Sequence, residues 1–264
     1  MNTASIRPPA RTRGFSLIEL AIVLLVVGVL LGTTVLTLSG QIEARDFAES
    51  RKQLDQARDA VYGFAVRNGR LPCPAPANGG LERFCVEPGG RTGGCTPTLT
   101  PQTHGRCSNP DGFLPAVTLG IGPVDAGGAI RDPWGSQVRY VVADTSTPAN
   151  AWVYTRPNGM KDTILGTPFV PNLRVCTTSA GSSVTDCDPA SPGSAAIAVL
   201  YSRGKNRSVG GVGADEQENA DGPADVVFVA KDTMAVGTPA EFDDTVIWIS
   251  PNILYNRLVS AGTL

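Results

Sequence analysis

Glu19 is a carboxylate near the start of the otherwise apolar run LIELAIVLLVVGVLLGTTVLTL, residues 17–38. An ionised side chain in hydrocarbon is costly, so an acidic residue there is expected to have a function and a partner that neutralises it. Residues 20–38 carry no charge and have about the length that a helix needs to cross a bilayer. The sequence therefore predicts a membrane-spanning helix with a carboxylate that needs a cationic partner.

Cysteine is the second residue type that could carry chemistry, either in disulfides or as a metal ligand. The six cysteines are Cys73, Cys85, Cys95, Cys107, Cys176 and Cys187. Zinc sites need close pairs such as C-x-x-C, whereas neighbouring cysteines here are ten or more positions apart. An even number of cysteines outside a membrane favours disulfides, which form in oxidising compartments. We expect three disulfides; Cys176 with Cys187 is the easiest pair to propose, and the pairing of the other four stays open.

Patterns typical of enzymes are absent from the sequence. The single histidine, His104, lies in a Cys- and Gly-rich stretch, and there is no G-x-S-x-G, no H-E-x-x-H and no phosphate-binding glycine loop. Asp243 and Asp244 are adjacent at the predicted turn and start of a strand. Consecutive side chains of a strand face opposite sides, so we do not expect these two to act together as a pair of catalytic carboxylates on one substrate. The formal charge of −2, without a basic patch that contains aromatic residues, argues against nucleic acid as a partner. We therefore expect a protein that is not an enzyme.

The charges on either side of the apolar run indicate its orientation. Arg7, Arg11 and Arg13 precede the run without an acidic residue, whereas acidic and basic residues are mixed after it. The positive-inside rule places the N-terminus in the cytoplasm and the rest of the chain outside. Ordinary signal-peptide cleavage is the weaker alternative, because the run is long and its far end only approximates a small-residue cleavage site.

The segment RGFSLIE resembles the N-terminal signal of type IV pilins and type II secretion pseudopilins. It combines a basic leader that ends in Gly14, an aromatic Phe15, Glu19 four residues later and a long apolar helix. The resemblance implies that a prepilin peptidase cuts after Gly14 and methylates the new amino terminus of Phe15. The alternative is an ordinary signal anchor with an incidental glutamate.

This resemblance also supplies a partner for Glu19. After cleavage, the amine of Phe15 on a neighbouring subunit is cationic and can reach the carboxylate within a bundle of such helices. A buried carboxylate that is paired with an amine is tolerated, whereas an unpaired one is strongly destabilising. Glu19 would therefore favour subunits that dock in one register.

The same helix is expected to continue beyond the membrane to Asn68. Apolar residues at intervals of three and four form one stripe on an otherwise charged helix, at Leu54, Ala57, Val61 and Phe64. We expect this stripe to pack on a globular domain. Gly69 suits the left-handed position that follows a helix, and Pro72 lies just beyond it.

Short runs rich in Val, Ile, Tyr and Trp predict a mostly antiparallel sheet after a long polar stretch from Cys73 to Pro123. These runs are SQVRYVVA, AWVYT, AAIAVLYS, ADVVFVA and DTVIWIS, and PNILYNRLVSAG predicts a short terminal helix with Pro251 in its first turn. The predicted fold is α+β, with a long N-terminal helix packed on the sheet and with disulfides in a loop-rich domain. The predicted divisions are a cleaved leader (1–14), a transmembrane assembly helix (15–40), the amphipathic half of that helix (41–68) and the domain (69–264).

Two further segments resemble major pseudopilins of type II secretion. RDPWGSQVRY resembles the D-P-W-G segment that precedes their sheet, and we interpret Asp132 to Gly135 as a turn without chemistry. LYSRGKNRSVGGVGADEQENADGPADVVF resembles their calcium loop. Calcium takes six to eight oxygen ligands on a flexible loop.

The resemblance implies a set of calcium ligands in the second segment. A backbone carbonyl at or near Tyr201, the side chain of Asn206 where the family has an aspartate, and Asp221 correspond to the family's ligands. Further oxygens within reach come from Asp215, Glu216, Glu218 and Asp225. Arg203, Lys205 and Arg207 place positive charge at the same end of the loop, which opposes a divalent cation. An acidic loop that is merely solvated or paired with these basic residues is the alternative.

Together these patterns predict a structural subunit, a minor or specialised pilin or pseudopilin, of a type IV pilus or a type II secretion pseudopilus. Its expected partners are other pilin-like subunits and a prepilin peptidase, and its expected location is the bacterial inner membrane with the C-terminal domain in the periplasm. Calcium is the one cofactor to test. The alternative function is a membrane-tethered binding protein or adhesin that does not polymerise.

Overall fold

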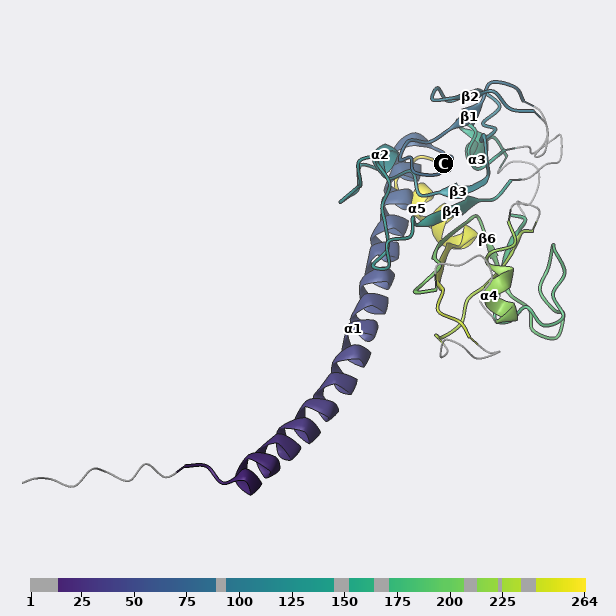
Figure 1. Cartoon of the computed structure of the whole chain (residues 1–264). Coiled ribbons are helices and arrows are strands. Elements are labelled where there is room, and N and C mark those ends of the chain that lie inside the picture. Colours follow the sequence, from purple (N-terminus) through teal and green to yellow (C-terminus); the bar gives the residue numbers. More distant parts are fainter. Residues whose placement is uncertain are drawn as a thin grey trace, which may run out of the picture. The chain divides into compact units, whose positions relative to one another are not determined.

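A computed structural model describes residues 14–88, 94–144, 152–163, 171–206, 213–222, 225–233 and 241–264, with only the backbone described at 31–39 and 162–163. The chain divides into two compact units, residues 1–45 and 46–264. Helix α1, Leu17–Asn68, contributes residues to both units (Figure 1). The predicted continuation of the first helix to Asn68 is therefore confirmed.

In the first unit, α1 begins directly after the predicted processing site. The side chains of Phe15 and Leu17 are exposed, as are the apolar side chains that follow as far as Leu30. Among the residues whose side chains are described, no helix has the length and apolar character needed to cross a membrane. The predicted transmembrane segment, 15–40, contains residues 31–39, whose side chains lie outside this description.

In the second unit, the remainder of α1 buries the predicted apolar stripe. Its four members, Leu54, Ala57, Val61 and Phe64, are each at most 6% exposed, and the first three belong to the main core. The helix ends at Asn68, whose side-chain amide donates to the carbonyl of Phe64 at 2.8 Å. Gly69 follows with φ of +64°, the left-handed conformation that glycine adopts without strain. The stripe and the end of the helix are thus as predicted.

The described residues of the domain form three sheets, and most of the strand pairs are antiparallel. The four-stranded sheet has the order β3 (Asp111–Phe113), β4 (Arg139–Val142), β7 (Ala198–Ser202), β9 (Thr245–Ile249), and all its pairs are antiparallel. The three-stranded sheet has the order β6 (Ser194–Ala196), β5 (Leu173–Cys176), β8 (Val227–Val229), and β5 pairs with β8 in parallel. Strands β1 (Phe84–Cys85) and β2 (Pro97–Thr98) form a small antiparallel pair. The fold therefore mixes helices with mainly antiparallel sheet.

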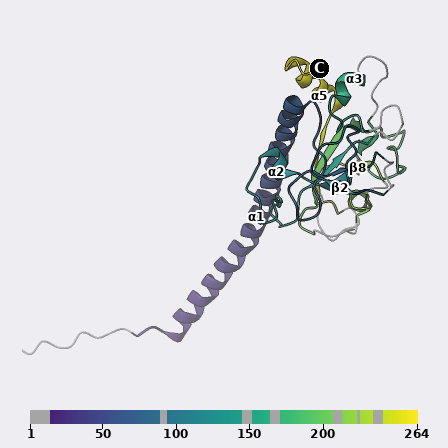
Figure 2. The same cartoon turned by 90° about the horizontal axis from the view of Figure 1, so that it is seen from above.

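Four shorter helices complete the described elements. They are α2 (Ala116–Leu119), α3 (Gly159–Thr163), α4 (Ala214–Glu218) and α5 (Pro251–Ser260). Helix α5 is the predicted terminal helix, with Pro251 in its first turn. It lies beside the last turns of α1 (Figure 2), where the Thr263 hydroxyl donates to the carbonyl of Val66 at 3.1 Å.

The structure corrects two of the predicted strands. AWVYT is not a strand: residues 152–155 form turns, and Trp152 has φ of +58°. Its four described residues are all buried, so its aromatic and β-branched composition reflects burial on all sides and not strand pairing. The run AAIAVLYS is divided at Ile197 between β6 and β7, which belong to different sheets. Strands β1, β2, β3 and β5 were not predicted.

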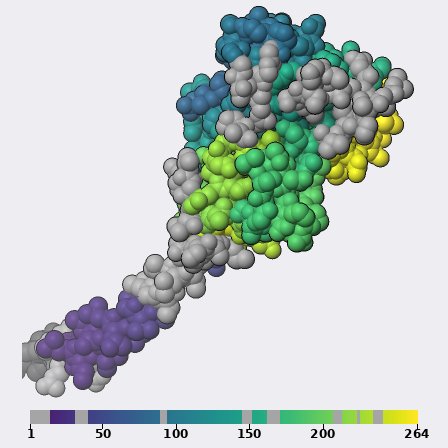
Figure 3. All heavy atoms as spheres, turned by 90° about the vertical axis from the view of Figure 1, so that its right-hand side faces the viewer, coloured from purple at the N-terminus to yellow at the C-terminus, as the bar shows by residue number. Residues whose placement is uncertain are grey.

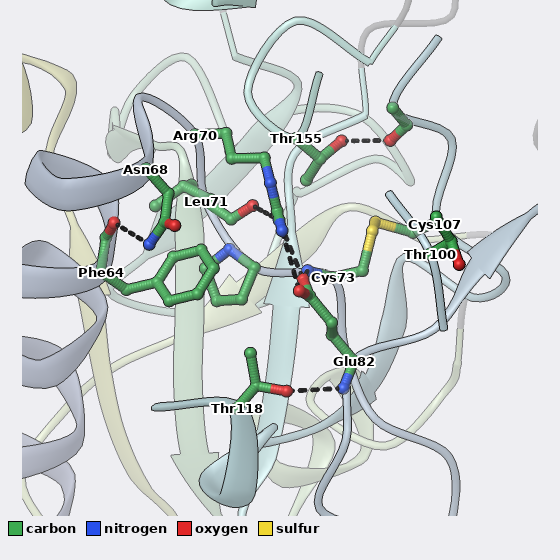
Figure 4. A network of polar contacts seen from close by, with 12 residues as sticks. Phe64, Asn68, Arg70, Leu71, Cys73, Glu82, Thr100, Cys107, Thr118 and Thr155 are labelled. Atoms are coloured by element: carbon green, nitrogen blue, oxygen red, sulfur yellow. Dashed lines mark hydrogen bonds and ion pairs between the residues drawn. A yellow bond between two sulfur atoms is a disulfide. The ribbon is translucent and has the colours of Figure 1, made fainter. Parts of the chain in front are cut away.

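A buried ion pair fixes the chain just after α1 (Figure 4). The guanidinium of Arg70 donates to both oxygens of Glu82, at 2.8 and 2.9 Å, and both side chains are almost fully buried. Arg70 also lies 5.0 Å from the ring centres of Phe64 and Phe84. Glu82 in turn accepts the amide of Cys73 at 3.1 Å. The pair therefore connects α1 to the start of the Cys-rich stretch.

All six cysteines form disulfides. The bonds join Cys73 to Cys107, Cys85 to Cys95 and Cys176 to Cys187, and no cysteine is free. This confirms the predicted three disulfides and the proposed pair Cys176–Cys187. It also settles the pairing of the first four cysteines, which the sequence left open.

Candidate functional site

The turn from Asp132 to Gly135 holds the end of β7 in place. The Asp132 carboxylate accepts the amides of Trp134 at 3.1 Å and Ser136 at 2.7 Å, and the hydroxyl of Ser202 donates to it at 2.6 Å. Trp134 packs 4.9 Å from the ring of Phe47. These contacts support the interpretation of this segment as a turn, and they place the chain that follows Ser202.

Three carboxylates meet where the chain leaves β7 and enters β9. Glu216 comes from α4, and Asp243 and Asp244 directly precede β9. One oxygen of each lies within 4.8 Å of the others, and the three residues are only 2, 1 and 3% exposed. We call Glu216, Asp243 and Asp244 the inner cluster.

Amide groups hold the inner cluster in position. The backbone amide of Asn206 donates to Asp243 at 2.9 Å, and its side-chain amide donates to Glu216 at 2.7 Å. The same side-chain amide donates to Glu241 at 3.1 Å. The side-chain amide of Asn219 donates to Asp244 at 2.9 Å. Asn206, which the resemblance places among the calcium ligands, thus lies at the cluster and contacts two of its members.

Two carboxylate oxygens of the inner cluster have no hydrogen-bond partner among the described residues. These atoms are Oε2 of Glu216 and Oδ1 of Asp243, and both are buried. A buried carboxylate oxygen that is neither hydrogen-bonded nor paired is strongly destabilising. Such atoms are the ligands that Ca²⁺ takes from proteins. The donor set therefore fits a hard divalent cation.

The pKa values of the inner cluster show the same excess of negative charge. Burial, together with the charge of the neighbouring Asp243, raises the pKa of Glu216 to about 8. Burial also raises the pKa of Asp244 to about 7, although the amide of Asn219 opposes this shift. The site thus disfavours three ionised carboxylates unless a positive charge joins them.

A cavity of about 830 Å³ adjoins the inner cluster at Asp244. Its walls include Phe47 and Arg51 of α1, Lys231 after β8, and Trp248 of β9. A metal site needs an entry path, and this cavity would bring a cation as far as Asp244.

The other predicted side-chain ligands of calcium lie elsewhere. For Tyr201 the predicted ligand is a backbone carbonyl at or near it, which stays a prediction; the Tyr201 side chain is in the core, where Nε of Arg139 donates to its hydroxyl at 3.3 Å. Asp215 binds Lys231 and the amide of Ser179, and these hydrogen bonds outweigh the effect of burial and lower its pKa to about 2. As Figure 3 shows, the residues around α4 lie against the green segment that contains Ser179 on one face of the molecule.

Asp221 and Asp225 form a second acidic group with Glu218, which we call the outer cluster. One oxygen of each lies within 4.8 Å of the others, but Asp221 is exposed and Glu218 is half-buried. Asp225 accepts the amide of Val227 at 2.6 Å. Burial and the charge of Asp225 raise the pKa of Asp221 to about 6 and that of Glu218 to about 7. The structure therefore divides the predicted ligands between two clusters and an ion pair.

The structure corrects the reason given for separating Asp243 from Asp244, because one carboxylate oxygen of each lies within 4.8 Å of the other. Both residues lie before β9 begins at Thr245, so the alternation of side chains along a strand does not separate them. Strands β7 and β9 are antiparallel neighbours with Ser202 opposite Thr245. The chain after β7 and the chain before β9 must therefore meet, and an acidic pair directly before a strand was the signal that could have located the site.

The predicted processing residues lie at the start of the helix. Gly14 and Phe15 precede α1, and the exposed Glu19 lies in its first turn. The amide of Glu19 donates to the carbonyl of Ser16 at 3.0 Å. The side chain of Phe15 is 84% exposed.

Comparison with known proteins identifies this N-terminal segment. Residues 9–35 match the family model described as the prokaryotic N-terminal methylation motif. No curated protein and no solved structure matches the chain. The likeness of the C-terminal part to major pseudopilins stays a prediction, since the match does not extend beyond residue 35. The chain therefore carries the N-terminal methylation motif that is the signal of type IV pilins and pseudopilins.

Proposed function

We propose that the protein is a structural subunit of a type IV pilus or a type II secretion pseudopilus. The observation that carries this proposal is the methylation motif at residues 9–35, which contains Gly14, Phe15 and Glu19. A helix with exposed apolar side chains begins three residues after Gly14. Apolar surface of this extent marks a membrane or protein interface. The subunit would use it first in the inner membrane and then against its neighbours in a filament.

The proposed topology rests on the sequence that flanks this helix. Three arginines precede it, and residues 20–38 carry no charge. The N-terminus would therefore be cytoplasmic and the domain periplasmic. Three disulfides in the domain agree with an oxidising compartment. The disulfide-bonded stretch from Cys73 to Cys107 supports a minor or specialised subunit, because it adds a separate surface to the helix and sheet.

Replacing Gly14 by leucine should block processing. The wild-type chain is expected to begin at an N-methylated Phe15, whereas the variant should keep its leader, because the peptidase cuts next to this glycine. Intact mass and N-terminal peptide analysis in a host with the peptidase would measure both states. Gly28→Leu is a matched control, since a side chain there meets nothing within 4 Å. A wild-type chain that begins at Met1 would contradict the proposal.

We also propose that the inner cluster binds a divalent cation, with Ca²⁺ as the first candidate. The specific support is the pair of buried oxygens on Glu216 and Asp243 that have no partner among the described residues. Glu216, Asp243 and Asp244 would hold the ion, and Asn206 would orient two of them. The ion would supply the positive charge that lets three buried carboxylates stay ionised together.

Calcium should raise the melting temperature of the full-length protein in detergent, relative to a chelator. A ligand that binds only the folded state stabilises it by about 2.7 kcal/mol at a concentration of 100 times its Kd. Asp243→Asn should abolish this gain, because it removes a charged ligand without changing the size of the side chain. Asp221→Asn, in the outer cluster, is the control that should retain it.

Two results would contradict the proposed cation site. An equal melting temperature with calcium and with chelator in the wild type would show that no stabilising cation binds. Loss of the gain in Asp221→Asn but not in Asp243→Asn would move the cation to the outer cluster.

A further inference from the structure

The side chain of Asn219 covers part of the edge of a β-strand. Asn219 is 2% exposed and directly follows α4. Its Oδ1 accepts the amide of Val229 at 2.8 Å, and its Nδ2 donates to the carbonyl of Val229 at 3.0 Å. Strand β8 is the last in the described order β6-β5-β8. One side-chain amide thus makes the two hydrogen bonds that a neighbouring strand would make with Val229.

The carboxylate of Asp225 acts in the same way two residues earlier on β8. It accepts the amide of Val227 at 2.6 Å. Residues 227 and 229 are two positions apart, so in a parallel pair their amides point to the same side of the strand. An uncovered strand edge is a template for pairing with another chain, and native proteins usually block it. Asn219 and Asp225 together block this side of β8.

The same Asn219 amide also contacts the inner cluster. Besides its bond to Val229, Nδ2 donates to Oδ2 of Asp244 at 2.9 Å. A side-chain amide nitrogen carries two hydrogens, so both bonds form at once. Glu216 lies in the last helical turn before Asn219, so α4 supplies both a cluster carboxylate and the group that covers the strand edge.

We propose that Asn219 is a positioning residue that couples cation binding at the inner cluster to closure of the β8 edge. This inference rests on the proposed cation site. A bound cation holds Asp244 toward Glu216 and Asp243, which keeps the Asn219 amide aligned with Val229. Without the cation, Asp244 is no longer held toward Glu216 and Asp243, so the Asn219 amide loses a fixed acceptor that orients it. Coupling of this kind is reciprocal, so a well-placed Asn219 also strengthens cation binding.

Two measurements on the full-length protein in detergent test the coupling. The first is hydrogen exchange of peptides that cover residues 225–233, with calcium and with chelator. Calcium should slow exchange at Val229 roughly tenfold in the wild type, within the usual range of coupling between sites. In Asp243→Asn, which retains Asn219, calcium should have no effect. Equal exchange rates in the wild type under both conditions, despite calcium binding, would overturn the proposal.

The second measurement is calcium affinity by titration calorimetry. Asn219→Ala should lower the affinity about 10- to 100-fold, as loss of a group that orients a metal ligand does. The control is Asn172→Ala, because Asn172 also accepts a backbone amide, that of Asp144 at 3.0 Å, but does so away from the cluster. Unchanged affinity in Asn219→Ala would refute the coupling while leaving the cation site intact. No calcium binding to the wild type would instead refute the cation site itself, and the coupling with it.

Discussion

Glu19→Ala should reduce the share of the protein found in filaments by at least about a hundredfold. In the proposed assembly, the amine of Phe15 on a neighbouring subunit is buried beside this carboxylate, and removal of one partner of a buried ion pair costs roughly 3 to 5 kcal/mol. Each 1.4 kcal/mol corresponds to about a tenfold change in an equilibrium constant. The quantity to measure is the ratio of protein in sheared filaments to protein in membranes, wild type against variant.

Controls for this prediction separate assembly from processing. Cleavage after Gly14 and membrane insertion should be unchanged, because one carboxylate near the end of an apolar helix adds only a modest cost to insertion. Glu43→Ala removes another carboxylate from the same helix and should leave the filament ratio near that of the wild type. Equal ratios for Glu19→Ala and the wild type would favour the alternative function, a membrane-tethered receptor or adhesin that does not polymerise.

Glu82→Ala should destabilise the domain by roughly 3 to 5 kcal/mol, because it leaves the guanidinium of Arg70 buried without its counter-charge. Both residues of the pair are less than a tenth exposed, and Arg70 is held between the rings of Phe64 and Phe84. The variant also removes the acceptor of the Cys73 amide. Denaturant unfolding of the oxidised protein would measure the loss.

Two matched variants show whether the unpaired charge is the cause. The double variant Arg70→Met with Glu82→Leu should recover much of the lost stability, because apolar groups of similar volume often replace a buried pair without loss. Asp55→Ala breaks the partly exposed pairs of Asp55 with Arg58 at 3.0 Å and with Arg51 at 3.8 Å, and should cost less than about 1 kcal/mol. If the Glu82 and Asp55 variants were equally stable, burial would not determine the strength of these pairs.

The elements that could be predicted from sequence are those whose signal is local. The spacing of Leu54, Ala57, Val61 and Phe64 depends only on the helical repeat, and it defined the buried face of α1 correctly. Gly69 predicted where the helix ends. The N-terminal segment indicated export to an oxidising compartment, and this led to the prediction of disulfides. The motif at residues 9–35 was recognisable for the same reason, since all its parts are adjacent in the chain.

The features that could not be predicted depend on the pairing of distant segments. Val153 and Tyr154 have strand-like composition, but they are buried in a turn. The division at Ile197 depends on which sheet each half of the run joins. The inner cluster forms because β7 and β9 are neighbours, which brings Asn206 to Asp243 at 2.9 Å. Nothing in the local sequence around Asp243 shows that contact.

The disulfides of the Cys-rich stretch form one covalent ring inside another. Cys85–Cys95 lies within the ring closed by Cys73–Cys107, and the outer ring begins five residues after α1 ends at Asn68. A protease that cuts one peptide bond between residues 86 and 94 would therefore release no fragment, because both new ends stay attached through sulfur. Residues 73–107 thus remain attached to the helix and the sheet after one such cut.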